Sequence, residues 1–587
     1  MNKKIYYFSM LLCLSMVAAC SGDDIVSDYS DNDDSGIISG DMVTFSVPDV
    51  SSFTITQNST PTGETATEPT ERTQSVTITF KADGTAESSN TELATTNGQT
   101  VTASTSGVNY ILTGSTAEGS SAAFNYKGTG DCTITLNGVS MNTTAKAIGA
   151  TKGGHVELVV KGTNTITSTA KKSIEVGDDT EGAEIYQKLD IYGDGVLNVA
   201  SSSKGAISST DAMTVNKGVV LNITIGSDAT GKKGLKSDTS IEFKGGRTTI
   251  INNAPAEWDT DELDYSAATC VKAPTITVSG GTVQCLATGN GGKGIRADDT
   301  MTVSEGSVEV ITTGKNLVYY NNADKVVELA QLDSYSNYED ANPKGIHVGD
   351  KDNSTGDLTI NGGSVKVRAV NSEGIESKMY LTVTGGTVAS YAGDDAINVG
   401  ISSENNKGNT YAGKGKVAIK GGTVYACSTS NDAIDANGTI SISGGVVVAC
   451  GDLAPEDGFD CDQNSFAITG GYVIGMGGST SSPTENACSQ SSLITSLSGV
   501  SEGNTLSLQI AGTTILQAEM PRTYSSATLL ISAPDMQKGR SYAILKNGSS
   551  INSGTLSSSA YVNGSSTGGG PGGGPGGGPG GGPGGGF

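Results

Sequence analysis

One short phrase returns along most of this chain and limits what it can fold into. From about Lys146 to Gly477 the phrase recurs roughly every 22 to 37 residues, a spacing typical of repeat architectures. Each copy carries a small residue and an aliphatic one, a spacer, a Leu/Met/Ile-Thr-Val/Ile run and then Gly-Gly-Thr/Ser-Val, most clearly in 373–388 and 432–447. Short alternating Val/Ile/Thr runs cut by glycines predict strands. A period above 20 residues built from strands predicts a β-solenoid, in which each coil buries its inner face against its neighbours.

The aligned copies share one apolar position, and we expect it to form a buried stack. Its members are Ile148, Ile174, Ile207, Leu235, Val271, Ile295, Ile346, Ile375, Ile397, Ile434 and Phe459.

Composition is compatible with a thin core and excludes some partners. The 587 residues are 35% hydrophobic and only 5% aromatic, with 82 glycines, which suits a solenoid better than a thick globular core. A net charge of −25 argues against nucleic acid, because phosphate binding needs a basic surface. With two histidines in the chain, a zinc site is not expected.

The N-terminus has the features of a lipoprotein leader. Lys3 and Lys4 precede an apolar run, and Val17-Ala18-Ala19-Cys20 resembles a bacterial lipobox, so we expect 1–19 to be a signal peptide and Cys20 to be lipidated. The acidic residues that follow resemble a surface-export signal. The sequence therefore predicts an outer-membrane lipoprotein, exposed on the cell surface and held to the membrane by its lipid alone.

The remaining chain divides by composition into five parts. We predict a flexible tether at 20–42, an N-terminal cap with the first coils at 43–145, the solenoid at 146–478, a small C-terminal β unit at 479–565, and a disordered Gly/Pro-rich tail at 566–587.

Several motifs together resemble a known family. Asn109-Tyr110-Ile111-Leu112-Thr113-Gly114, Leu136-Asn137-Gly138-Val139, Gly162-Thr163-Asn164-Thr165-Ile166 and the later Gly-Gly-Thr-Val coils are similar to those of the bacterial carbohydrate-binding β-helix family. That resemblance covers roughly 76–477. It implies an all-β, pectate-lyase-like right-handed parallel β-helix that binds calcium and cellulose-like or acidic plant-wall polysaccharides.

Two positions of the phrase change charge along the solenoid. The opening position is basic in earlier coils and acidic in later ones: Lys146, Lys172, Lys233, Lys293, Lys344, then Glu373, Asp395, Asp432 and Asp457. Three residues on, Lys236, Lys272, Arg296 and His347 give way to Glu376, Asn398, Asp435 and Asp460. Stacked carboxylates about 5 Å apart repel one another, so the acidic columns need a cation or raised pKa values.

Calcium is the expected cation, because it binds several hard oxygen ligands. Its candidate ligands are Asp394, Asp395, Asp432, Asp435, Asp457, Asp460 and Asp462. The alternative is a solvated acidic edge without a tight ion.

A polysaccharide partner has two groups of candidate contacts. Lys293, Arg296 and Lys344 suit uronate carboxylates, or else form a surface ladder that only separates coils. Trp258, Tyr319 and Tyr320 suit stacking on sugar rings, or else pin two insertions to the solenoid.

No residue stands out as catalytic. A calcium-dependent lyase would need a base beside the metal, but the densest carboxylates lie coils away from Lys293 and Arg296. We therefore predict a non-catalytic polysaccharide-binding protein, with a polysaccharide lyase and a surface adhesin or spacer as alternatives. Cys427 and Cys450 occupy equivalent places in successive coils, as small buried thiols or as a disulfide.

Overall fold

The computed structural model describes residues 42–178, 180, 183–260, 264–320, 323–327, 339–350, 355–400, 414–462 and 464–557. The predicted signal peptide, Cys20 and the Gly/Pro-rich tail lie outside these residues. Within the described part of the chain, no helix has the length and apolar character needed to cross a membrane.

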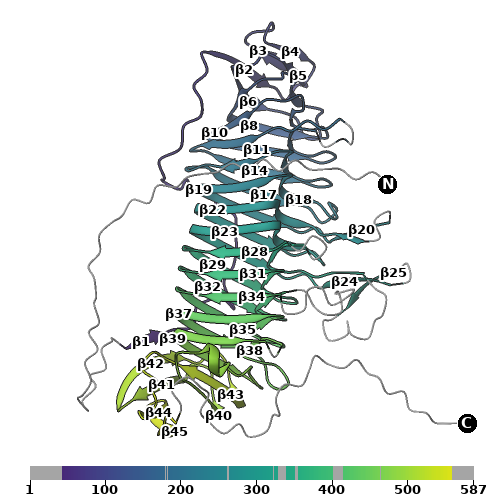
Figure 1. Ribbon diagram of the computed structural model, residues 1–587. Helices are drawn as coiled ribbons and strands as arrows, with labels where there is room; N and C mark the ends of the chain where they lie inside the picture. Colours follow the sequence, from purple (N-terminus) through teal and green to yellow (C-terminus); the bar gives the residue numbers. More distant parts are fainter. Residues whose placement is uncertain are drawn as a thin grey trace, which may run out of the picture. The chain divides into compact units, whose positions relative to one another are not determined.

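Most described strands belong to one 35-stranded sheet, the main sheet, in which coil lies upon coil (Figure 1). Its strands pair in parallel with their equivalents in the next coil and form three ladders. The first ladder contains β2 (Gln74–Phe80), β6 (Val108–Ser115), β8 (Cys132–Thr143), β10 (Val156–Lys161), β13 (Leu189–Gly193), β16 (Met213–Val215), β19 (Ser240–Asn252), β22 (Thr269–Ala287), β23 (Lys293–Thr312), β28 (Asp357–Ile360), β31 (Tyr380–Val383), β34 (Lys416–Ile419), β37 (Thr439–Cys450) and β39 (Phe466–Gly477).

The second and third ladders complete each coil. The second adds β11 (Thr163–Ser168), β14 (Val196–Ser201), β17 (Val220–Ile225), β29 (Ser364–Ala369), β32 (Thr387–Ala392) and β35 (Thr423–Ser428). The third adds β5 (Thr100–Ala103), β7 (Ala123–Tyr126), β9 (Ile148–Ala150), β12 (Ile174–Val176), β15 (Ile207–Ser209), β18 (Lys233–Ser237), β27 (Ile346–Val348), β30 (Ile375–Ser377), β33 (Ile397–Val399), β36 (Ile434–Ala436) and β38 (Phe459–Asp460). The long strands β22 and β23 run through all three ladders and join them into one sheet.

The predicted apolar stack is confirmed. Every member from Ile148 to Phe459 pairs in register with the next, and each side chain is at most 1% exposed. The stack belongs to a continuous apolar cluster that runs through the interior of the main sheet. At about 25 cal/mol per Å² of buried apolar surface, this interior is the main source of stability.

The repeated Gly-Gly pair marks a bend where successive coils lie very close. Its second glycine has a positive φ, for example 76° at Gly386 and 81° at Gly445. A Cβ atom on Gly386 would lie 2.6 Å from the carbonyl carbon of Gly362 in the preceding coil. Both conditions disfavour a side chain at Gly386, so this bend requires glycine.

Strands of both termini cover the ends of the main sheet. At one end, β3 (Ala86–Ser88) pairs antiparallel with β2, and β4 (Ala94–Asn97) with β5. At the other, β43 (Tyr524–Ser532) pairs antiparallel with β39 and with β40 (Ser492–Val500). A short 3-10 helix, η3 (Glu485–Ala487), precedes β40.

The predicted fold class therefore needs correction. A right-handed parallel β-helix with a separate small C-terminal β unit was expected, but one continuous sheet encloses the core. The physical reason is that long strands turn the corners without a break, and that β40 and β43 satisfy the last coil's exposed backbone groups. Part of the expected C-terminal unit thus belongs to the main sheet.

Three smaller sheets lie outside the main sheet. A five-stranded sheet has the order β1 (Val43–Phe45), β42 (Thr513–Glu519), β41 (Thr505–Ile510), β44 (Ser541–Lys546), β45 (Ser549–Thr555). The two predicted insertions form the hairpin β20 (Glu257–Asp259) with β21 (Asp264–Ser266), and the sheet of β25 (Ala323–Val327), β24 (Asn316–Tyr320) and β26 (Glu339–Ala341).

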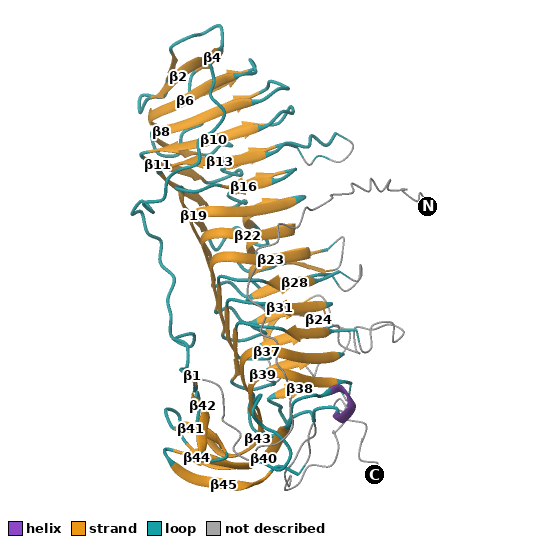
Figure 2. Ribbon diagram, turned by 60° about the vertical axis from the view of Figure 1, so that its left-hand side comes forward, coloured by secondary structure: helices purple, strands orange, loops and turns teal. Residues whose placement is uncertain are grey.

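Residues 46–73 form a strap along the outside of the main sheet, a feature that the sequence did not reveal (Figure 2). The strap starts beside the C-terminal strands, because β1 pairs in parallel with β42. It then runs toward earlier coils: Ser51 O accepts a hydrogen bond from Arg368, Gln57 donates to Ile223 O, and Glu64 accepts the amides of Gly218 and Gly246 from two adjacent coils. The part expected as cap and first coils, 43–145, thus contains β1 and the strap before β2.

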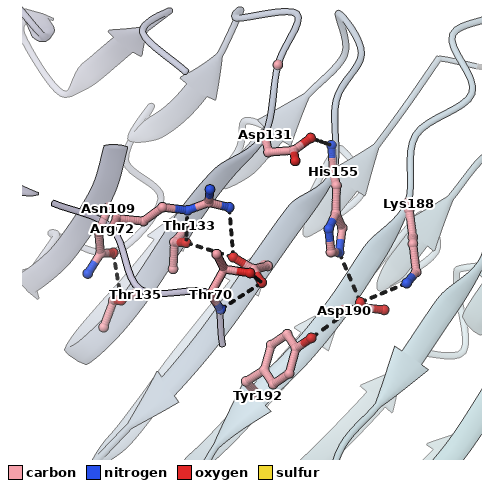
Figure 3. A network of polar contacts seen from close by, with 12 residues as sticks. Thr70, Arg72, Asn109, Asp131, Thr133, Thr135, His155, Lys188, Asp190 and Tyr192 are labelled. Carbon is pink, nitrogen blue, oxygen red and sulfur yellow. Dashed lines mark hydrogen bonds and ion pairs between the residues drawn. The ribbon is translucent and has the colours of Figure 1, made fainter. Parts of the chain in front are cut away.

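The strap ends in a buried polar network on the first ladder (Figure 3). Thr70 donates its amide and hydroxyl to Glu157 Oε1, at 2.9 and 2.6 Å, and Arg72 forms an ion pair with Glu157 Oε2 at 2.8 Å. Burial alone would raise the pKa of Glu157, but these donors together with Thr133 lower it. Glu157 therefore fastens the strap as an ionised carboxylate.

The Glu157→Gln variant tests this fastening. The amide lacks the charge that pairs with Arg72, so we expect the free energy of unfolding to fall by about 1–3 kcal/mol and the strap to become open to proteolysis. Chemical denaturation and limited proteolysis would measure both. Glu242→Gln, on the same ladder but half-exposed and paired with Lys244, is the matched control. An intact strap in Glu157→Gln would contradict the fastening role.

Candidate functional site

The two charged columns predicted from the sequence exist. Lys236, Lys272, Arg296, His347, Glu376, Asn398, Asp435 and Asp460 pair in register from β18 to β38. The opening positions lie three residues earlier in each coil, with Thr269 between Lys233 and Lys293, and backbone bonds such as Ala396 N to Asp432 O connect successive coils. The third ladder thus carries cations in its earlier coils and carboxylates in its later ones.

Ion pairs neutralise the junction between the two charge types. Lys344 Nζ lies 2.8 Å from Glu373 Oε1 and 2.6 Å from Glu376 Oε1. His347 Nδ1 lies 3.0 Å from Glu376 Oε2, but burial lowers the pKa of His347 to about 4, so this contact is made by a neutral imidazole. Lys378, which the sequence did not single out, also pairs with Glu376. Burial would lower the pKa of Lys344, but the two glutamates raise it well above its ordinary value. Lys344 is 7% exposed and is committed to these partners.

Beyond the junction, three aspartates converge. Asp432, Asp435 and Asp460 each offer a carboxylate oxygen, and these oxygens lie within 4.8 Å of one another. Asp432 and Asp435 flank Ala433-Ile434 at the start of β36, and Asp460 ends β38 one coil later. In-register pairing of Asp435 with Asp460 brings the last two together. We call these three residues the acidic cluster.

The other predicted metal ligands surround the acidic cluster. Asp395 accepts from Asn398 Nδ2 at 2.8 Å, and the same amide donates to Asp435 Oδ2 at 3.3 Å. Asp457 donates its backbone amide to Asp432, and Asp462 donates its own to Asp460 Oδ1 at 3.0 Å. Asp394 Oδ1 accepts a hydrogen bond from Asn431 Nδ2 at 2.6 Å. Asn398 and Asn431 were not predicted as site residues. Asn398 could have been found, because it stands between Glu376 and Asp435 in the same column.

The electrostatics of this region are unfavourable in the absence of a cation. Burial, followed by the Asp457 and Asp460 charges, raises the pKa of Asp432 to about 8. Burial and neighbouring carboxylates likewise raise the pKa of Asp457 to about 7 and hold that of Asp435 well above its usual range.

A second pair of stacked carboxylates in the same sheet behaves in the opposite way. Asp190 pairs in register with Glu157, but His155 and Lys188 lie 3.0 and 2.9 Å from Asp190 Oδ2 (Figure 3). Burial would raise the pKa of Asp190, yet these partners lower it to about 2. The chain therefore supplies cations where Glu157 and Asp190 stack, whereas carboxylates dominate the surroundings of Asp432.

The acidic cluster has the donor set that a hard divalent cation requires. Calcium takes six to eight oxygen ligands, and carboxylates whose charges are otherwise uncompensated are favourable ligands. Asp432, Asp435 and Asp460 would hold the ion, with Asp457 and Asp462 beside them. The residues present therefore fit calcium.

The predicted carbohydrate contacts differ in accessibility. Lys293 is 7% exposed and donates to Asn342 O at 2.8 Å, whereas Arg296 is partly exposed and bonds Asp298 Oδ1 at 2.8 Å. Trp258 packs edge-on against Tyr265, with ring centroids 5.1 Å apart, in a small cluster that also contains Leu317. The side chains of Tyr319 and Tyr320 lie outside the described residues.

The cysteines within the described residues are free thiols. Cys427 and Cys450 pair in register, as expected, and both are buried. The interpretation as small buried thiols is the one that the structure supports.

Comparison with known proteins identifies the family. A family model described as "Carbohydrate-binding domain-containing protein" matches residues 97–349 and 345–533, so the chain belongs to this family. No curated protein matches. One solved structure, the polysaccharide lyase-like protein from C. thermocellum as a gadolinium derivative, is 14% identical, covers 60% of this chain and 94% of its own, and has a TM-score of 0.25. That score is too low to carry an argument.

The raised pKa values predict how stability depends on pH when divalent cations are removed. The folded state binds the protons of Asp432 and Asp457 more tightly than the unfolded chain, whose aspartate pKa is about 3.9. Their contribution is therefore full below about pH 4 and is lost as pH rises through about 7 to 8. In EDTA, the melting temperature of the wild-type chain should fall from pH 5 to pH 8 more steeply than that of Asp432→Asn. Equal slopes would contradict this electrostatic account; Asp228→Asn, at an exposed turn, is the control.

The junction makes a separate prediction. Lys344→Met leaves Glu373 and Glu376 buried with less compensation, so the free energy of unfolding should fall by about 3–5 kcal/mol. Lys161→Met, at an exposed position of β10, should change it by less than about 0.5 kcal/mol. Urea denaturation of both variants measures the free energy of unfolding. If Lys344→Met lowers it as little as Lys161→Met does, the junction is not a structural ion-pair network.

Proposed function

We propose that this chain is a surface lipoprotein that binds polysaccharide, without cleaving it, through the calcium-containing acidic end of its main sheet. The observation that carries the proposal is the convergence of Asp432, Asp435 and Asp460 oxygens within 4.8 Å. Membership of the carbohydrate-binding domain family supports a glycan as the partner. The lipobox around Cys20 supports the lipoprotein assignment and the cell-surface location.

Calcium would supply the positive charge that the acidic cluster lacks and coordination positions for ligand oxygens. The chain's own residues do the rest. Asp432, Asp435 and Asp460 hold the charge at a fixed place on the third ladder, and Asn398 orients two neighbouring carboxylates by donating to Asp395 and Asp435. The stacked coils make this surface rigid, so little conformational entropy is lost on binding.

Binding without cleavage is favoured by the distribution of the basic groups. A lyase requires a base within hydrogen-bond reach of the substrate proton beside the metal. Lys344, the last lysine of the columns, and Lys378 beside it are engaged by Glu376, and Lys293 is buried and bonded to Asn342. None of these is placed to act as a base at the acidic cluster.

A glycan array with calcium and with chelator tests the proposal. We expect binding to a subset of polysaccharides in calcium, reduced at least tenfold by EDTA and in the Asp432→Asn/Asp460→Asn double variant. Asp228→Asn should bind as the wild type does.

Three results would contradict the proposal. Binding that is unaffected by EDTA would remove calcium from the account, and no binding to any glycan would favour the adhesin or spacer alternative. An increase in ultraviolet absorbance on incubation with polygalacturonate would instead indicate a lyase.

A further inference from the structure

A polar pocket lies on the basic part of the third ladder, well before the acidic cluster in the chain. Its volume is about 180 Å³, and its lining includes Lys233, Lys272 and Arg296 with Ser266 and Thr269. The cations come from three successive coils, because Lys233 pairs with Thr269 on β22, and Lys272 pairs with Arg296 on β23. Hairpin β20–β21 supplies Ser266 and the exposed Asp264 at the pocket.

The pocket side chains are held by the protein but keep unused donors. Lys233 Nζ donates to Gly231 O at 2.6 Å and to Ser266 Oγ at 2.8 Å, which uses two of its three N–H groups. Arg296 donates Nε to Asp298, and its terminal nitrogens carry four further N–H donors. Lys272 Nζ lies 3.6 Å from Asp298 Oδ2, beyond a direct hydrogen bond.

The charges in this pocket are not balanced by the protein. Three cations meet two carboxylates, of which Asp264 is exposed and accepts its neighbour's amide, and Asp298 serves both Lys272 and Arg296. Burial, followed by the Lys272 charge, lowers the pKa of Lys233 to about 7, and burial followed by Arg296 lowers that of Lys272. Both lysine pKa values are thus lowered, whereas the carboxyl pKa values at the acidic cluster are raised. The pocket therefore favours a negatively charged occupant.

We propose that the pocket of Lys233, Lys272 and Arg296 binds an oxyanion, a carboxylate or sulfate substituent of a glycan. This inference rests on the proposed glycan binding and adds a separate subsite, on the basic part of the third ladder, that recognises a charged substituent. Arg296 presents the planar fork of N–H donors that matches such groups, and the lysines supply point charges. A volume of about 180 Å³ accommodates the charged group and the ring edge that bears it. Ser266, whose hydroxyl oxygen accepts a hydrogen bond from Lys233, can donate its own proton to a neutral sugar oxygen.

Titration calorimetry of the whole protein in calcium tests the pocket with three oligosaccharides: an oligogalacturonide, a sulfated galactan and a neutral galactan. We expect one or both anionic oligosaccharides to bind at least tenfold more tightly than the neutral one. The Lys272→Met/Arg296→Met variant should lose at least tenfold in affinity for the anionic ligand and less than twofold for the neutral one. Lys161→Met, an exposed lysine of an earlier coil, should behave as the wild type does. The ligand that binds identifies the oxyanion as carboxylate or sulfate.

Inorganic sulfate separates failure of the pocket from failure of glycan binding. The melting temperature is measured in sodium sulfate and in sodium chloride at equal ionic strength. The gain in melting temperature on changing chloride for sulfate should be larger for the wild type than for the Lys272→Met/Arg296→Met variant. If no oligosaccharide binds but this difference holds, the pocket stands as an anion site and the proposed glycan function fails. If glycans bind with equal affinity whatever their charge, and sulfate has the same effect on both proteins, the pocket proposal is overturned.

Discussion

In-register pairing of parallel strands is the constraint on which this protein depends. Each residue of a coil lies about 4.8 Å from its equivalent in the next coil, so every position is repeated as a column. For apolar residues the repetition is favourable, and the stack from Ile148 to Phe459 is buried throughout. For charged residues the same repetition places like charges side by side, and each such column must be neutralised by other means.

The charged columns meet three different situations along the main sheet. Near the N-terminal end of the main sheet, the stacked Glu157 and Asp190 receive Arg72 from the strap and Lys188 from their own ladder. In the middle, Lys344 pairs with Glu373 and Glu376 of the next coil, and Lys378 pairs with Glu376 of its own coil. At the acidic cluster, carboxylates face carboxylates, and the raised pKa of Asp432 is the consequence. The acidic cluster and the Lys233 pocket are thus two places in the described part of the chain where the protein's own charges leave a need for a ligand of opposite sign.

Sequence periodicity predicted what the repeat itself encodes. The apolar stack, the glycine bends, the two charged columns and their change of sign were all predictable, because each is a property of equivalent positions in successive coils. What lies outside the repeat was not predictable. The strap has no periodicity, its fastening at Glu157 joins residues far apart in sequence, and the pairing of β43 with β39 depends on a non-repetitive segment. Lys344 was expected at a surface for glycan contact. It is buried instead, because Glu373 and Glu376 of the next coil pair with it, and the basic residues taken by themselves do not reveal those partners.

Calorimetric titration of calcium into the EDTA-stripped protein at pH 8 tests whether the acidic cluster requires a cation. The account predicts saturable binding, abolished in Asp435→Asn and retained in Asp228→Asn. It also predicts a gain in folding stability of about 2.7 kcal/mol when free calcium exceeds its Kd a hundredfold. Absence of saturable binding in the wild-type chain, or equal binding in Asp435→Asn, would contradict the account.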